Sequence, residues 1–280
     1  MVKYIKFLKK EFLLAGHIMS LGGALLTLTL LLILEKQVSF SLILSIYLFV
    51  QPIFWIDRYI GFRGDLEANK ERSDHLSSYF KYIPFISLAY VITFVYVSWF
   101  HVSNQNFILG VVLLIMGCLY ALVFKKITRY VLGFKNFFVA TFYVFFLIYG
   151  LIYSNQSIFT IPIALLATFV FIRSLYIQIF FDFKDIKDDA QNKLKTFPVV
   201  LGSYKTIKIL NVLNFLSIAP ILIALFLYQL PLWSLTISVP FITYMYALRG
   251  LKNKPELKWF LLVGFEYILI GLVGLIVLII

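Results

Sequence analysis

Residues 209–248 read ILNVLNFLSIAPILIALFLYQLPLWSLTISVPFITYMYAL and contain no charged side chain. A helix needs roughly 20 apolar residues to cross the hydrocarbon core of a bilayer, so this stretch is long enough for two crossings. Proline cannot continue a helix, and we place the break between the two crossings at Tyr228–Pro231. The stretch therefore predicts two consecutive membrane-spanning helices.

Windows of the same kind recur on both sides of this stretch. They cover residues 16–34, 37–56, 82–100, 107–124, 137–153, 158–181 and 259–280, and the only charged residues inside them are Arg173 and Glu266. None of the windows alternates strictly between apolar and polar residues, so helices are favoured over a barrel. The sequence predicts an all-α integral membrane protein with one domain, residues 1–280, built as a bundle of nine transmembrane helices. Ionisable residues inside spans are functional candidates by default.

Composition supports the membrane assignment. Hydrophobic residues make up 62% of the 280 residues, charged residues 14%, and the mean hydropathy is +0.95. Soluble domains are nearer half apolar and a quarter charged, which excludes a water-soluble enzyme, a disordered chain and a DNA-binding domain. The single cysteine, Cys118, rules out a disulfide within the chain.

Basic residues predict the orientation of the chain in the membrane. Of 25 Lys and Arg residues, 23 precede the first window or fall in alternate connections, and Lys36 is the one that falls in the remaining connections. Cytoplasmic loops carry the excess of Lys and Arg, so we expect a cytoplasmic N-terminus and an external C-terminus in a multi-pass protein of a bacterial inner membrane. Residues 1–15 are interpreted as an amphipathic N-terminal segment, in preference to a signal peptide.

Acidic residues are distributed differently, since nine of 13 fall in two clusters that begin just beyond the second and sixth windows. In the second cluster, Gln178, Asp182, Asp185 and Asp189 are separated by four, three and four residues and would share one face of a continuous helix. Three carboxylates on one face repel each other unless a cation binds them. The alternative is a solvated helix end whose partners are Lys184 and Lys187.

The first cluster contains Asp57 and Asp65, which are about two helical turns apart. An ordinary charged loop is an equally good interpretation of this segment alone. Basic residues follow both clusters: Arg72 the first, and Lys193 and Lys195 the second. Oxygen ligands suit Mg²⁺, which usually takes one or two carboxylates together with substrate phosphates. The two clusters therefore predict a Mg²⁺–diphosphate site at the cytoplasmic mouth of a central cavity.

At this point the sequence resembles a known family. Asp182–Asp189, followed by Lys195-Thr196-Phe197-Pro198-Val199-Val200-Leu201-Gly202, is similar to the second Asp-rich motif of the UbiA superfamily of intramembrane prenyltransferases. Lys135-Asn136, before the fifth window, also resembles that family. The resemblance implies Mg²⁺-dependent transfer of an isoprenyl group from a prenyl diphosphate to a small aromatic acceptor, in quinone or related lipid biosynthesis. It implies no nucleic-acid partner.

The resemblance also implies roles for individual residues in the two cytoplasmic Asp-motif regions, 57–81 and 182–208. The catalytic residues would be Asp185 and Asp189. The Mg²⁺ ligands would be Asp57, Asp65, Asp182, Asp185 and Asp189. The diphosphate would be bound by Asn69, Arg72, Lys193 and Lys195. Gly61 stands where the family's first motif has its middle carboxylate, which leaves open a weaker metal site, a replacement by Glu67, or a non-catalytic relative.

Two further classes of protein remain as alternatives. A transporter of an anionic or lipidic solute could use the same acidic vestibule, although it would be expected to carry carboxylates near the bilayer midplane and broken helices. A CDP-alcohol phosphotransferase would carry a compact Asp-x-x-Asp-Gly motif, which this sequence lacks.

Overall fold

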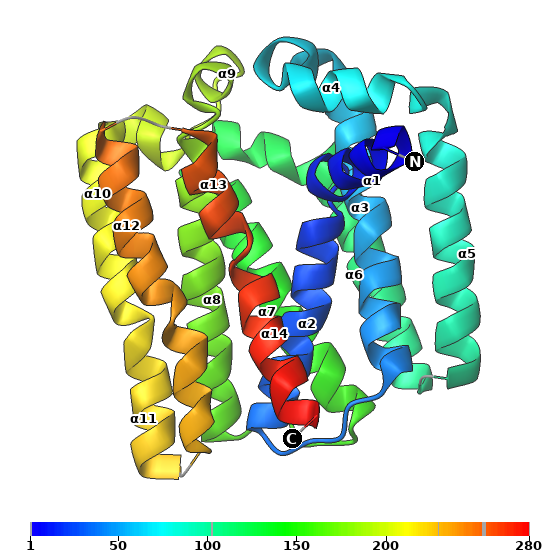
Figure 1. Ribbon diagram of the computed structural model, residues 1–280, viewed down its shortest axis with the longest axis vertical. Helices are drawn as coiled ribbons and strands as arrows, with labels where there is room; N and C mark the ends of the chain where they lie inside the picture. The colour runs from blue at the N-terminus through cyan, green and yellow to red at the C-terminus, as the bar shows by residue number, and fades with distance from the viewer. Residues whose placement is uncertain (1, 102, 229, 254–255, 280) are drawn as a thin grey trace.

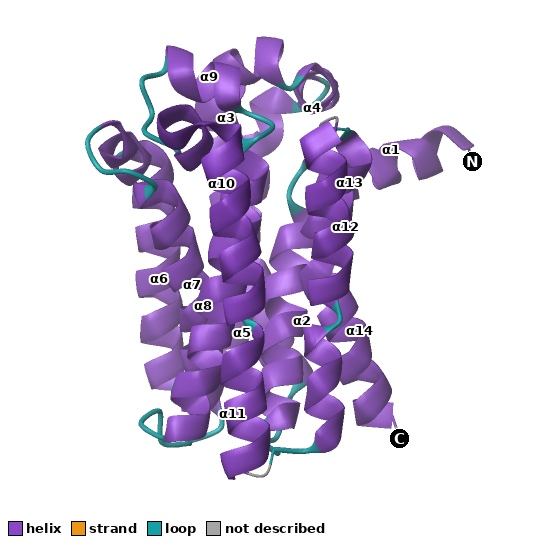
Figure 2. Ribbon diagram, turned by 90° about the vertical axis from the view of Figure 1, so that its left-hand side faces the viewer, coloured by secondary structure: helices purple, strands orange, loops and turns teal. Residues whose placement is uncertain are grey.

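The computed structural model describes residues 2–101, 103–228, 230–253 and 256–279, and within these ranges the chain forms helices and no strand. The long helices run side by side, while α4 and α9 lie across one end of the bundle (Figures 1 and 2). The N-terminus lies near that end and the C-terminus at the opposite end. The predicted all-α membrane architecture is therefore observed.

The helical elements follow one another with short connections. In the first half of the chain they are α1 (Val2–Leu14), α2 (His17–Ile33), α3 (Phe40–Ala68), α4 (Lys70–Ser77), η1 (Phe80–Tyr82), α5 (Ile83–His101), α6 (Asn104–Leu122) and η2 (Phe124–Arg129). In the second half they are α7 (Phe134–Tyr153), α8 (Ile161–Asp182), α9 (Ile186–Gln191), α10 (Phe197–Leu216), α11 (Ile218–Tyr228), η3 (Leu232–Ser238), α12 (Pro240–Asn253), α13 (Leu257–Gly264) and α14 (Glu266–Ile279).

The number of membrane crossings differs from the predicted nine. Within the described residues six helical stretches are long and apolar enough to cross a bilayer, and the number rises to eight if two bent pairs each count as one crossing. The bent pairs are α1 with α2 and α13 with α14, with bends of 63° and 42°. The predicted break after Tyr228 is present, but the window that follows it divides into the 3₁₀ helix η3 and the 14-residue α12. The nine-span prediction is therefore not confirmed.

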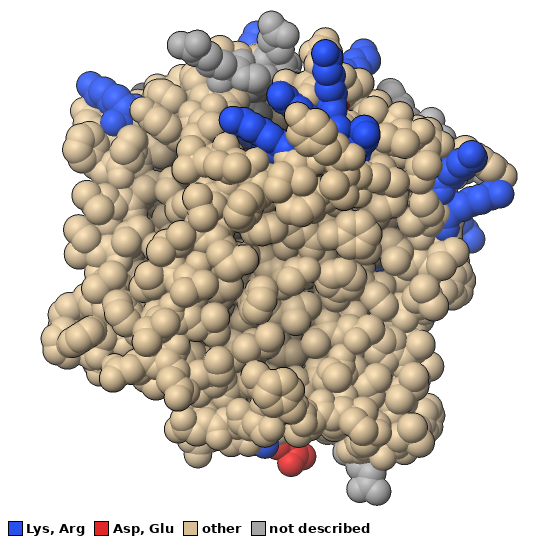
Figure 3. Space-filling view, turned by 180° about the vertical axis from the view of Figure 1, so that it is seen from behind, with Lys and Arg blue, Asp and Glu red and all other residues tan. Residues whose placement is uncertain are grey.

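Charged side chains gather at one end of the bundle. Figure 3 shows Lys and Arg over the end that carries α4 and α9, with a broad uncharged surface below them and one acidic group at the far end. Large apolar side chains of the long helices are exposed, including Phe85 and Trp99 on α5 and Phe226 on α11. A surface of this kind suits contact with lipid, so the chain is a multi-pass integral membrane protein.

The bundle closes where the first long helix packs against the last. Glycines allow the two backbones to approach: a side chain at Gly271 would overlap Leu25, and one at Gly274 would overlap Thr29. The Thr29 hydroxyl donates a hydrogen bond to the carbonyl of Ile270 at 3.1 Å. Small residues and hydroxyls are the usual means of helix association in membranes. Helices α2 and α14 therefore form a tight seam between the two ends of the sequence.

A buried ion pair and its neighbours link four helices, α8, α10, α12 and α14. The Arg173 Nε on α8 donates to the Glu266 carboxylate on α14 at 2.8 Å. Its Nη1 donates to Asn214 on α10 at 2.8 Å and to Ser217 at 3.2 Å, and its guanidinium lies 4.0 Å from the ring centre of Tyr244 on α12. The two ionisable residues that the sequence singles out inside spans therefore neutralise each other.

The first prediction concerns this ion pair. We expect Glu266→Leu to lower the free energy of unfolding by about 3–5 kcal/mol, because it leaves Arg173 buried without its counter-charge. The double variant Arg173→Met/Glu266→Leu should regain most of that loss. Unfolding of the detergent-solubilised protein measures both effects.

The exposed pair between Lys258 and Glu256 supplies the control. Lys258→Met should change the unfolding free energy by less than about 1 kcal/mol, because solvent screens that pair. A Glu266→Leu protein as stable as the unmodified chain would show that the buried pair contributes nothing.

Candidate active site

A cavity of about 640 Å³ lies between the long helices and reaches the basic end of the bundle. Its inner wall is apolar and comes from α2, α3, α7, α8 and α13, and includes Met19, Val50, Phe142, Phe146, Phe181 and Phe260. Its outer part is lined by polar and charged residues of α1, α3, α4 and the α8–α9 turn. The cavity therefore joins a charged mouth to an apolar interior.

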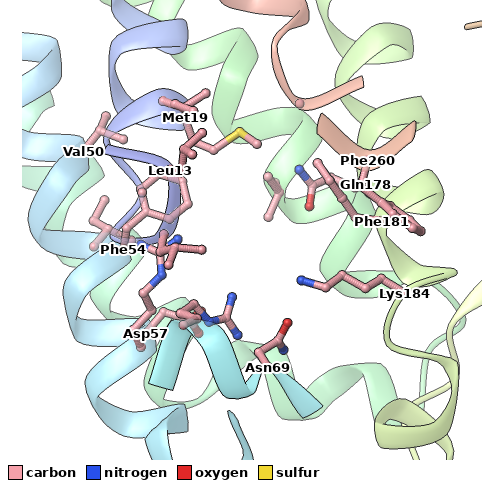
Figure 4. Close-up of a pocket in the computed structure, with 18 of the residues that line it drawn as sticks. Leu13, Met19, Val50, Phe54, Asp57, Asn69, Gln178, Phe181, Lys184 and Phe260 are labelled. Carbon is pink, nitrogen blue, oxygen red and sulfur yellow. The ribbon is translucent and has the colours of Figure 1, made fainter. Parts of the chain in front are cut away.

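Besides Lys10 on α1, Arg58 on α3, and Lys70 and Glu71 on α4, five polar residues from three distant segments line the mouth. They are Asp57 on α3, Asn69 and Arg72 at the start of α4, and Lys184 and Asp185 between α8 and α9. Asp57 and Lys184 lie on opposite sides of the cavity, and Asn69 lies between them, on α4 (Figure 4). The structure thus brings both predicted acidic regions to one opening.

Asp57 is the half-exposed acidic group on the α3 side. Its Oδ1 accepts a hydrogen bond from the Lys125 ammonium at 3.2 Å, and 36% of the Asp57 side chain is exposed. Because solvent screens such a pair, the carboxylate can exchange Lys125 for another cation at small cost. Asp57 is therefore available to a ligand in the cavity.

The acidic stripe predicted for the second cluster is not continuous. Helix α8 ends at Asp182, the next residues turn, and Asp185 precedes the first residue of α9. The turn is held by backbone hydrogen bonds that span three residues, such as that from the Asp185 amide to the Asp182 carbonyl at 3.2 Å. The break separates the carboxylates: Asp185 lines the cavity, while Asp182 and Asp189 lie outside its lining. The break thus takes Asp185 away from the other two carboxylates, while Asp182 and Asp189 stay close to each other.

The other two carboxylates, those of Asp182 and Asp189, point toward Lys135 at the start of α7. Its ammonium lies 2.9 Å from Asp189 Oδ2 and 3.1 Å from Asp182 Oδ1. The neighbouring Asn136 donates a hydrogen bond to Asp182 Oδ2 at 2.9 Å. Asp182 and Asp189 are each 3% exposed, so Lys135 supplies the charge that allows both to be buried.

Lys135 was not among the predicted site residues, although its segment resembles the family. The available signal was its position, since it is the last cation before an uncharged window. From the sequence, Lys184 is expected only as a partner of the acidic cluster at a solvated helix end. In the structure it points into the cavity (Figure 4).

The two lysines predicted to bind a diphosphate do not line the cavity. Both side chains are exposed, and the Lys195 ammonium donates to the Tyr130 carbonyl at 3.2 Å. The backbone of the same residue bonds to Thr128 and Gly133 and fixes the start of α10 against the α6–α7 connection. The basic-Thr-Phe-Pro segment therefore has a structural role here. The cations that line the cavity are Lys10, Arg58, Lys70, Arg72 and Lys184.

Part of the first acidic cluster lies outside the described side chains, namely those of Asp65 and Glu67. Helix α3 does continue through Gly61, so Asp57 and residue 65 lie on one helix. Among the side chains that the structure describes, no three carboxylates, histidines or cysteines gather closely enough to hold a metal ion alone. A metal at this mouth would need further ligands from its substrate, as Mg²⁺ commonly does.

Outside the cavity mouth, Tyr79 contacts the carboxylate of Glu11. Burial raises the pKa of the Tyr79 phenol, and its 2.6 Å hydrogen bond to Glu11 raises it further. The phenol therefore stays protonated and acts as a donor.

Comparison with known proteins identifies the family. Residues 80–267 match the model of the UbiA prenyltransferase family. This match covers most of the chain, and the protein therefore belongs to the UbiA prenyltransferase family. The matched region contains Lys135 and the second acidic cluster, and the first acidic cluster lies before it. No curated protein sequence matches the chain significantly.

Solved structures show the same fold at low sequence identity. A UbiA homologue from Aeropyrum pernix K1 is 11% identical, with a TM-score of 0.76 over 95% of this chain and 99% of that one. A UbiA homologue from Archaeoglobus fulgidus, solved with GPP and Mg²⁺, is 15% identical, with a TM-score of 0.70 over 97% and 100%. A digeranylgeranylglyceryl phosphate synthase is 18% identical, with a TM-score of 0.60 over 96% of each chain.

Proposed function

We propose that the protein transfers an isoprenyl group from a prenyl diphosphate to a small acceptor. The supporting observation is the single cavity that joins a mouth of carboxylates and cations to an apolar, aromatic interior. A prenyl diphosphate has the same division, with an anionic head and a hydrocarbon tail. The A. fulgidus homologue was solved with such a molecule, GPP, and Mg²⁺.

The residues at the mouth fit a Mg²⁺ ion bound together with a diphosphate. Asp57 and Asp185 supply hard carboxylate oxygens and Asn69 supplies an amide oxygen. One or two carboxylates plus substrate phosphates are the usual ligands of Mg²⁺, so the absence of three clustered acidic groups among the described side chains is no obstacle. When bound, the metal would neutralise charge that develops on the leaving diphosphate.

We assign two roles to three further cations, Lys184, Arg72 and Lys135. Lys184 and Arg72 bind diphosphate oxygens by charge-assisted hydrogen bonds. Lys135 holds Asp182 and Asp189, and so fixes the turn that presents Lys184 and Asp185. Among the predicted ligands, Asp189 and Asp182 would then act by shaping the mouth or by exchanging Lys135 for the metal. Asp65, Lys193 and Lys195 stay predictions.

The apolar interior would protect the reacting carbon from water. Breaking the bond between the allylic carbon and the diphosphate leaves positive charge on that carbon, and water would capture it. The rings of Phe54, Phe138, Phe142 and Tyr143 line the cavity, and aromatic faces stabilise a nearby cation. We propose a small aromatic acceptor, of the kind used in quinone or related lipid biosynthesis, and a cytoplasmic mouth in a bacterial inner membrane.

The second prediction tests the carboxylates. We expect Asp185→Asn and Asp189→Asn each to lower Mg²⁺-dependent turnover of a prenyl diphosphate roughly hundredfold or more. Asp185→Asn removes a carboxylate that lines the cavity, and Asp189→Asn weakens the ion pair with Lys135 that fixes the turn carrying Asp185. Release of diphosphate from labelled prenyl diphosphates, with a panel of aromatic acceptors, measures turnover.

Asp188→Asn is the matched control, because Asp188 lies in the same short helix but outside the cavity and bonds to Asn192. That variant should keep its activity. A folded Asp185→Asn/Asp189→Asn protein with normal turnover would exclude the proposed reaction. An unmodified protein that binds the diphosphate but never turns it over would favour a non-catalytic relative, and solute flux in vesicles would favour a transporter.

The third prediction concerns Lys184. Lys184→Met should raise the dissociation constant of a Mg²⁺–prenyl diphosphate roughly ten- to hundredfold, because a hydrogen bond to a charged group contributes about 1.5–3 kcal/mol. Lys187→Met, three residues away and outside the cavity lining, should leave binding unchanged. Equal effects of both substitutions would show that only general charge matters, and Lys184 would have no specific role.

The fourth prediction concerns the missing carboxylate. A side-chain carbon built at Gly61 meets no atom within 4 Å, and the position lies one turn beyond Asp57 on the same helix face. We expect Gly61→Asp to lower the Mg²⁺ concentration needed for half-maximal activity several-fold, since it adds a carboxylate next to Asp57.

Gly61→Asn is the control that separates the effect of charge from that of helix propensity. Asparagine has nearly the same shape as aspartate but carries no charge. Only the aspartate should change the Mg²⁺ requirement. If both variants act alike, position 61 does not contribute to the metal site.

A further inference from the structure

A second buried polar cluster lies beside the cavity and takes no part in its lining. At its centre is the carboxylate of Glu11 on α1. Oε2 accepts from the Tyr79 hydroxyl at 2.6 Å and lies 2.8 Å from His75 Nε2, while Oε1 lies 3.3 Å from His17 Nε2. None of these four residues lines the cavity. We define them as the Glu11 cluster.

In this cluster three donors share one acceptor group, the Glu11 carboxylate. An ionised carboxylate only accepts hydrogen bonds, so each histidine Nε2 must carry its proton toward Glu11. The other ring nitrogen of His17 lies 2.6 Å from the Tyr47 hydroxyl, which completes its bonding. His17 and His75 are 7% and 8% exposed, so removal of Glu11 would leave buried donors without an acceptor.

The cluster joins α1 to the far end of α4. His75 is in the last turn of α4 and Tyr79 follows that helix, whereas Asn69 and Arg72 are at its start and line the cavity. Helix α4 has only eight residues, of which Ser73, His75 and Leu76 are buried. So short a helix with so little buried apolar surface depends on tertiary contacts for its position.

The other partner in the cluster, α1, is held to the bundle independently. The Gln51 side chain on α3 donates to the Ala15 carbonyl at 3.0 Å, just after α1. A second link between α1 and α4, from Lys10 to Glu71 at 3.2 Å, is exposed on both sides and is therefore weak. Leu76 of α4 also packs in a small buried apolar group with Ala15, Trp55 and Ile83, and the Glu11 cluster adds the buried polar contacts between α1 and the end of α4.

We propose that Glu11 is a positioning residue that fixes α4 against α1 and thereby keeps Asn69 and Arg72 at the cavity mouth. The consequence for substrate rests on the proposed function, since the diphosphate is the ligand those residues would bind. The placement of α4 itself does not rest on it. Residues 1–79 precede the region that matches the family model, so this device belongs to the part of the chain outside that match.

The fifth prediction tests the placement directly. In the ligand-free protein in detergent, Glu11→Gln should speed hydrogen–deuterium exchange in residues 70–79 by roughly ten- to hundredfold, because charge-assisted hydrogen bonds of about 1.5–3 kcal/mol are lost. Exchange in α7 and α8 should be unchanged. Tyr79→Phe, which removes one donor and leaves α1 intact, should give a smaller increase in the same residues.

Asp74→Asn is the matched control: it makes the same chemical change on α4, at an exposed carboxylate next to His75. It should leave exchange unaffected. Unchanged exchange in Glu11→Gln, or a rise spread evenly over the bundle, would overturn the proposal.

A second measurement separates positioning from general loss of structure. If the protein turns over a prenyl diphosphate, Glu11→Gln should raise KM for that substrate at least several-fold with kcat nearly unchanged. A fall in kcat with KM unchanged would contradict a role in placing α4. If the unmodified protein has no such activity, the exchange experiment still decides the role of Glu11, and only the proposed function fails.

Discussion

The cavity mouth depends on the ion pairs that the Lys135 ammonium makes. The ammonium lies between two buried carboxylates, Asp182 at the end of α8 and Asp189 in α9. Without a cation between them, two negative groups so close could not both be buried and ionised. By holding them apart from the cavity, Lys135 fixes the turn in which Lys184 and Asp185 face inward. The charge pattern at the mouth thus follows from one buried lysine at the start of α7.

The cavity joins an apolar interior to a charged mouth. Its interior is built from the same types of apolar and aromatic residue as the outer surface of the bundle. Its mouth has carboxylates and cations from four segments: α1, α3, α4 and the α8–α9 turn. Charged residues are scarce in this sequence, and each charged group in a membrane helix needs a partner. A concentration of charged residues at the mouth therefore indicates a specific role. Arg173 and Glu266 satisfy the need for a partner with each other. At the mouth, Asp57 is paired with the half-exposed Lys125 instead.

The sequence predicted the class of fold and the location of the site better than its details. Long uncharged windows identify helices because lipid offers the backbone no partner, and acidic clusters at helix ends identified the mouth. Spacing alone could not reveal that α8 stops at Asp182, since the stripe of Asp182, Asp185 and Asp189 assumed one unbroken helix. Nor could it reveal Lys135 as the partner of two carboxylates, because that contact joins residues about 50 positions apart. The nine-span count is not confirmed among the described residues, because the window after Tyr228 divides into η3 and the 14-residue α12, and local hydropathy does not report helix length.

The two sides of the mouth are held in different ways, and this bears on how they can vary. The α7–α10 side lies within the region that matches the family and is fixed by a buried ion pair that needs no ligand. The α3–α4 side lies before that region, lacks a carboxylate at Gly61, and is held through α1. A short helix fixed by a few polar contacts can shift without disturbing the bundle. A shift on the α3–α4 side would therefore change the shape of the mouth, while the turn that carries Asp185 stays in place.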